Sequence, residues 1–110
     1  MILKTNRQYL EDLNSYFIPF MLKALESRQR IDEGTEAELL DKICYSVLQD
    51  IYLVFQRKKL TVQEKFTIRF KDAEGIIFMR GLINFPLPAD QFWRQNLRNQ
   101  IIEQLDKQIL

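Results

Sequence analysis

The segment 36–59 constrains the fold most, because its apolar side chains recur with helical spacing along its whole length. The residues that share this broad apolar face are Leu40, Ile43, Cys44, Val47, Leu48, Ile51, Val54 and Phe55. Thr35 and Glu38 have the spacing of a capping box at its start. The bases at 57–59 suit the negative end of a helix dipole. The pattern predicts a long amphipathic helix over 36–59, which must bury one face against other elements.

Two further segments have helical patterns. Thr5 and Gln8 form a second capping-box pair, and a wide apolar arc follows them, so we predict a helix over about 6–28. Pro19 within it removes one backbone hydrogen bond, which predicts a kink or a break. A proline-rich connector precedes a third helix, predicted over about 88–108. The apolar stripe of that helix is Trp93, Leu97, Ile101 and Leu105.

Between these helices, residues 66–71 alternate strictly between apolar and polar side chains, a pattern typical of a half-buried strand. Residues 72–75 begin with Asp and end with Gly, as type I turns prefer, and the apolar segment 76–85 follows. We therefore predict an antiparallel β-hairpin, with Gly81 at a bulge or a close approach. The predicted fold class is α+β, in the order α-α-β-β-α, with the hairpin packed on the helices in a single domain, 1–110.

The residue inventory excludes most catalytic chemistry. The chain has no histidine, one cysteine and three glycines among its 110 residues. Without imidazole there is no triad, one thiol cannot build a thiolate metal site, and no glycine-rich phosphate loop is present. We therefore expect no enzymatic activity, no cofactor and no metal. Cys44 lies on the apolar face of 36–59 and is expected to be a small buried hydrophobe.

Cysteine usage and hydropathy also bear on location. A lone cysteine cannot form an internal disulfide, which fits a reducing compartment. The N-terminus lacks the long apolar core of a signal peptide. The longest apolar run, 16–22, has seven residues, far short of the roughly 20 that span a bilayer. We therefore expect a cytoplasmic protein that does not enter a membrane.

Charge is distributed unevenly along the chain, although the net charge is only +1. Residues 26–56 carry seven acids against three bases, whereas residues 57–98 carry nine bases against four acids. This asymmetry predicts an electrical dipole, which steers charged partners or favours head-to-tail contact between copies.

As a strand, the segment 76–85 would have large apolar side chains on both faces, and a hairpin over helices covers only one of them. We predict that Ile76, Phe78 and Leu82 lie on the uncovered face and bind a second copy, unless the last helix crosses that face. This apolar surplus predicts a non-enzymatic interaction or regulatory accessory protein that acts as a homo-oligomer, with a homodimer joined through the hairpin or the first helix as the simplest form.

Trp93, Arg94 and Arg98 are a second candidate site, for another protein. The two arginines lie one turn apart on the apolar arc of the last helix and suit a carboxylate or phosphate, and the indole suits an anchoring role. Alternatively, their stems cover the core while the guanidinium groups reach water, or they pair with acids such as Asp41 or Asp50.

The alternative function is that of a nucleic-acid-binding accessory factor. Bases on a twisted ribbon suit phosphates, and in a suitable register Arg80 joins the first strand's bases from the second strand. The candidate residues are Arg57, Lys58, Lys59, Arg69, Lys71 and Arg80. The competing interpretation is that charge on an edge strand prevents unwanted pairing.

Overall fold

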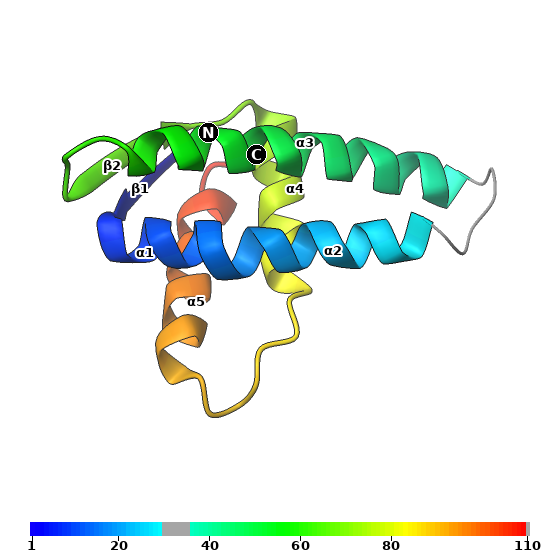
Figure 1. Ribbon diagram of the computed structural model, residues 1–110. Coiled ribbons are helices and arrows are strands. Elements are labelled where there is room, and N and C mark those ends of the chain that lie inside the picture. Colours follow the sequence, from blue (N-terminus) through cyan, green and yellow to red (C-terminus); the bar gives the residue numbers. More distant parts are fainter. Residues whose placement is uncertain (30–35, 110) are drawn as a thin grey trace.

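The computed structural model describes residues 1–29 and 36–109. In chain order its elements are β1 (Ile2–Asn6), α1 (Arg7–Asp12), the π-helical segment η1 (Leu13–Phe17), α2 (Ile18–Gln29), α3 (Glu36–Lys59), β2 (Lys65–Arg69), α4 (Asp72–Ile83) and α5 (Phe92–Asp106). The class is α+β, as the sequence predicts, because helices carry a two-stranded antiparallel sheet. Figure 1 shows α1 and α2 as one long rod lying antiparallel beside α3, with α4 and α5 running across this pair.

The first predicted helix is present, but it begins one residue later than its expected cap. Asn6, not Thr5, is the N-cap: its side-chain oxygen accepts a hydrogen bond from the backbone N–H of Tyr9 at 2.8 Å. Thr5 belongs to β1 instead. The capping box predicted at Thr35 lies outside the described residues.

Pro19 neither breaks the rod nor ends it. The π-helical turn η1 lies just ahead of it, with the N–H of Ile18 bonded to the carbonyl of Leu13, five residues back. Pro19 is therefore the second residue of a new α-helical segment, where a missing N–H matters least. The predicted break is thus absent, and a local widening of the helix lies just ahead of Pro19.

The sheet pairs β1 with β2 in antiparallel register, with Leu3 opposite Ile68 and Thr5 opposite Phe66. These four side chains face inward and are buried. The strand predicted at 66–71 is confirmed as β2. Its partner, however, is the N-terminal segment, so the prediction of a hairpin with 76–85 was wrong.

Residues 72–83 form helix α4 instead of a turn and a strand. The Glu74 carboxylate accepts a hydrogen bond from the backbone N–H of Lys71 at 2.7 Å, which stabilises the first helical turn. The residues of α4 that are buried recur with helical spacing: Gly75, Phe78, Met79 and Leu82. The close approach expected at Gly81 is present, but between two helices: a Cβ there would lie 2.9 Å from the sulfur of Met21 in α2.

Helix α5 begins at Phe92 rather than near 88, because residues 88–91 form a turn in which the N–H of Gln91 donates to the carbonyl of Pro88 at 3.2 Å. Leu97, Ile101 and Leu105 are buried in the core, as predicted, whereas Trp93 is 41% exposed. Cys44 is partly buried and packs against the core. Among the helices of the described residues, none combines the length and the apolar character needed to cross a bilayer.

Candidate interaction surfaces

The apolar face predicted for 76–85 does not exist in the structure. Phe78 and Leu82 are completely buried within this one chain, where the ring of Phe78 packs against Phe55 and Phe70. Ile76 is 37% exposed. The side chains expected to bind a second copy are therefore mostly core residues of α4, because a helix turns them inward where a strand would have left them outside.

Arg94 is held by contacts within the chain. Its Nε lies 3.2 Å from both carboxylate oxygens of Asp12, its Nη1 donates to the side-chain oxygen of Gln91 at 3.1 Å, and its guanidinium lies 3.5 Å from the centre of the Tyr16 ring. The acid is thus Asp12 of α1 rather than a carboxylate of α3. These contacts join α5 to the α1–α2 rod.

Arg98 also has an internal partner, since its Nη1 donates to the backbone carbonyl of Phe85 at 3.0 Å. Trp93 packs edge-to-face on Tyr9, with the ring centroids 5.8 Å apart, and leaves part of its indole in solvent beside the exposed Phe92. Of the three predicted residues, Trp93 is exposed and the two arginines are partly buried, and the role of Trp93 as a partner anchor stays a prediction.

Five of the six bases proposed for nucleic acid are spread over three elements, and the sixth, Lys71, lies between β2 and α4 as the N-cap of α4. Arg57, Lys58 and Lys59 form the last turn of α3, and Arg69 ends β2. Arg80 lies on α4, so it does not join Arg69 on a strand as expected. The structure brings a different set together: Lys4, Lys65 and Arg69 are exposed and belong to the outer face of the sheet.

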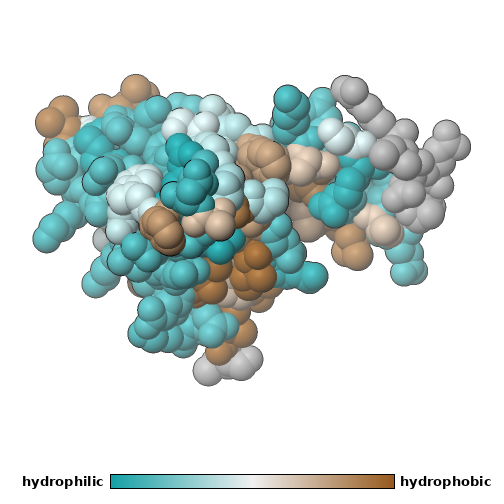
Figure 2. Space-filling model, turned by 90° about the horizontal axis from the view of Figure 1, so that it is seen from below, coloured by the Kyte–Doolittle hydropathy of each residue, from teal (hydrophilic) through white to brown (hydrophobic). Residues whose placement is uncertain are grey.

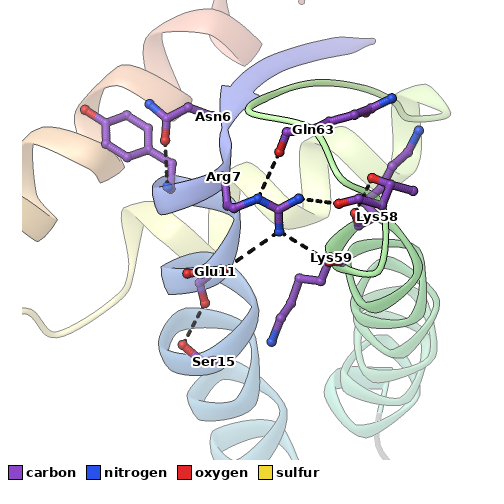
Figure 3. Close-up of polar contacts among 9 residues, drawn as sticks. Asn6, Arg7, Glu11, Ser15, Lys58, Lys59 and Gln63 are labelled. Carbon is purple, nitrogen blue, oxygen red and sulfur yellow. Dashed lines mark hydrogen bonds and ion pairs between the residues drawn. The ribbon is translucent and has the colours of Figure 1, made fainter.

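Arg7 organises the connection between α3 and β2 (Figure 3). Its Nε donates to the carbonyl of Gln63 at 2.9 Å, its Nη1 donates to the carbonyl of Lys59 at 3.3 Å, and its Nη2 donates to the carbonyl of Thr61. Glu11 lies 3.9 Å away as an ion-pair partner. Sequence reasoning missed this residue, because nothing near it in the chain indicates where its donors go.

The start of α3 exposes an apolar stripe, which consists of Leu39, Leu40 and Ile43 and is called the α3 stripe below. Leu40 is 61% exposed and Ile43 is 56% exposed, although the sequence places both on the buried face. The buried residues of α3 lie in its second half, where other elements cross it, whereas its first half projects with α2 beyond α4 (Figure 1). Without a third element to cover it, this part of the predicted apolar face stays in solvent.

A view from below shows that hydrophilic side chains cover most of that side (Figure 2). Hydrophobic side chains interrupt them in the middle of the face and at the left margin, near the connection between α3 and β2. In that connection Leu60 and Val62 are both strongly exposed. Apolar surface is therefore divided among several places.

Two glutamines close the outer edge of β1: Gln104 of α5 and Gln108, two residues beyond the end of that helix. Gln108 accepts from the N–H of Ile2 at 2.7 Å and donates to the carbonyl of Ile2 at 2.6 Å. Gln104, one turn earlier, accepts from the N–H of Lys4 and donates to its carbonyl, both at 3.0 Å. A shallow groove of about 640 Å³ runs along this seam and is lined by these residues and their neighbours. The seam is a structural contact rather than a cavity with chemistry.

Within residues 1–29 and 36–109, no three histidine, cysteine or acidic side chains gather as a metal site would require. Comparison of the chain with models of protein families, with curated proteins and with solved structures found no match. The candidate function is therefore argued from these surfaces alone.

Proposed function

We propose that this chain is a small non-enzymatic interaction protein that acts as a homodimer joined through the α3 stripe. The observation that carries the proposal is the exposure of three large aliphatic side chains on one side of a helix end that projects from the body. Contiguous apolar surface of this kind marks protein contacts more often than isolated exposed residues do. The absence of histidine from the sequence supports the non-enzymatic part of the proposal.

The charges of α3 lie unequally about the α3 stripe. Glu36 and Glu38 of its first turn border the stripe, whereas the bases 57–59 form its last turn. A helix rises about 1.5 Å per residue, so Arg57 lies about 21 Å from Ile43 along the helix axis. Contact between two stripes therefore does not reach the basic ends of α3, and association depends on the exposed aliphatic side chains.

The size of the α3 stripe sets the expected strength. Complete burial of one Leu or Ile stabilises by about 1.5–3 kcal/mol, and half-exposed side chains contribute about half of that. Three from each copy give a total of about 5–9 kcal/mol. Association costs at least about 4 kcal/mol in lost rigid-body freedom. We therefore expect a weak dimer whose population depends on concentration.

The test is sedimentation equilibrium over a range of protein concentrations, with Ile43→Glu compared with Leu53→Glu. Both residues lie on α3 and are similarly exposed, but Leu53 does not belong to the α3 stripe. We expect the native chain and Leu53→Glu to dimerise alike, and Ile43→Glu to stay monomeric. A monomer at every concentration, or equal loss in both variants, would contradict the proposal.

Nucleic-acid binding is the second candidate function. Lys4, Lys65 and Arg69 on the outer face of the sheet favour it, because the described residues provide no ion-pair partner for them. Binding of this kind weakens steeply with salt. A labelled single-stranded oligonucleotide should shift at low salt and lose binding in Lys65→Gln/Arg69→Gln; absence of a shift at low salt would remove this candidate.

A further inference from the structure

The outer edge of β2 has the geometry of a strand-addition site. Met1 and Phe70 exchange both backbone hydrogen bonds at 2.7 Å, and the N–H of Arg7 bonds to the carbonyl of Glu64 at 2.9 Å. Hydrogen-bonded and non-hydrogen-bonded pairs alternate in an antiparallel ladder. Thr67 lies opposite Lys4, a non-hydrogen-bonded pair, so its N–H and C=O face away from β1.

The same alternation applies to Lys65 and Arg69, which lie opposite Asn6 and Ile2. Within the described part of the chain no hydrogen bond reaches the backbone of Lys65, Thr67 or Arg69, and all three residues are exposed. β2 therefore presents three consecutive outward peptide groups to solvent. A new strand needs this arrangement to pair.

The other edge of the sheet cannot serve, because Gln104 and Gln108 already occupy the outward groups of β1 at Ile2 and Lys4. Addition is therefore confined to β2. We infer that the open edge of β2 binds an extended acidic segment of another protein as a third, antiparallel strand.

The acidic character of that segment follows from the two charges that border the edge. Lys65 and Arg69 are exposed, and none of the ion pairs among residues 1–29 and 36–109 involves them. Carboxylates on alternate residues of an added strand would lie opposite them, and opposite charges in cross-strand positions are favourable.

The same charges exclude a second copy as the occupant. Symmetric antiparallel pairing of two β2 strands along their full length is centred on Thr67 and places Lys65 of each copy opposite Arg69 of the other. Like charges directly opposite each other destabilise the pair. The bases at this edge thus oppose self-pairing and leave an acidic strand as the complementary partner. Since the α3 stripe takes no part, this inference does not rest on the proposed dimer.

The decisive probe is an acetylated, amidated peptide of sequence TEVEVET, tested in two N-methylated forms. Methyl groups on one alternate set of amides block the face that pairs with β2, whereas methyl groups on the other set leave that face intact and do not change the charge. We expect one form to bind like the parent peptide and the other to bind at least about tenfold more weakly. Equal binding of both forms would overturn strand addition and leave charge attraction alone.

Hydrogen exchange on the native chain locates the contact. The parent peptide should slow exchange at the amides of Lys65, Thr67 and Arg69, and leave those of Ile2 and Lys4 unchanged. Protection elsewhere without protection of these three amides would refute the assignment. An oligothymidine that protects the same amides more strongly than the peptide would assign the edge to nucleic acid.

Variants complete the test. Thr67→Pro removes the central outward N–H and should weaken the peptide at least about tenfold, while Thr67→Val should not. Lys65→Gln/Arg69→Gln should weaken it and flatten its salt dependence. Ile43→Glu should bind the peptide normally, which separates this inference from the dimer. If Thr67→Pro does not fold, the two N-methylated peptides on the native chain still decide the question.

Discussion

The two strands of the sheet share one ladder, but their outer edges are completed differently. The outer edge of β1 meets Gln104 of α5 and Gln108 just beyond the end of that helix, which donate to and accept from its peptide groups. The outer edge of β2 meets solvent between Lys65 and Arg69. A glutamine amide carries the same donor and acceptor as a peptide group, so α5 completes β1 as a third strand would. β2 has no such substitute.

This difference between the two edges shows what stabilises such a small sheet. Two strands alone are marginally stable, so the sheet needs support from elsewhere. β1 receives it from α5 and from the rod that follows it directly, whereas β2 is held by β1 and by the carbonyl contacts of Arg7 just before it. The sheet is thus anchored along one edge, and the other edge stays available.

The largest loss of stability is expected from a change on the buried face of α5, which packs on the core beside the outer edge of β1. Leu105 is completely buried and lies next to Gln104 in the helix. Leu105→Ala should lower the free energy of unfolding by about 2–5 kcal/mol in urea denaturation, because it removes buried methyl groups and leaves a cavity.

The matched control is Leu53→Ala, whose side chain is half-exposed on α3 and should cost no more than about 0.5 kcal/mol. In Leu105→Ala the amides of Ile2 and Lys4 should also exchange faster, since α5 positions the glutamines. Equal costs in the two variants would mean that α5 does not anchor the sheet.

A smaller loss of stability is expected from substitution of Gln104 and Gln108. Gln104→Ala/Gln108→Ala removes the four hydrogen bonds to β1 at an exposed seam and a fifth, from Gln108 to the carbonyl of Gln104, and each contributes about 0.5 kcal/mol at the low end of the usual range, so the loss should be about 2.5 kcal/mol. Gln100→Ala is the control, since Gln100 lines the same seam one turn earlier and no hydrogen bond of its side chain is found among the described residues. If Gln100→Ala lowers the free energy of unfolding as much, the two glutamines do not stabilise the outer edge of β1 as argued.

Sequence reasoning found the elements whose signals are local. The helix over 36–59 is present with these bounds, and the strand at 66–71 is present almost as predicted. In both segments, residues only a few positions apart share one face, so the period of the apolar residues is sufficient to identify the element. The exposure of Leu40 was not predictable in the same way, because it depends on where α4 crosses.

The error at 76–85 has a physical reason. The segment is rich in Ile, Phe and Leu, and its Ile and Phe residues favour a strand by composition. The spacing of Gly75, Phe78, Met79 and Leu82 is nevertheless helical, and the Glu74 contact stabilises the helix start. Helical spacing therefore outweighed composition. Because the segment is a helix, the apolar face predicted to bind a second copy is absent.

The two outer edges of the sheet could not be predicted from the sequence. β1 is five residues long and pairs with a strand some sixty residues later, so no local pattern identifies it. Gln104 and Gln108 look like solvent-exposed helix residues until the position of β1 is known. Contacts between distant segments depend on the whole topology, which residue spacing does not encode.

The smallest change in stability is expected from substitution of two threonines, one on each strand of the sheet. Thr5 of β1 has a buried hydroxyl with no hydrogen-bond partner among the described residues, whereas Thr67 of β2 is exposed. A buried hydroxyl without a partner carries its desolvation cost, so Thr5→Val should raise the free energy of unfolding by about 1 kcal/mol. Thr67→Val should change it by no more than about 0.5 kcal/mol, because its hydroxyl stays in water. Urea denaturation of both variants measures the difference. If Thr5→Val lowers the stability, the hydroxyl has a partner in solution, and the inner face of β1 is held by a polar contact as its outer edge is.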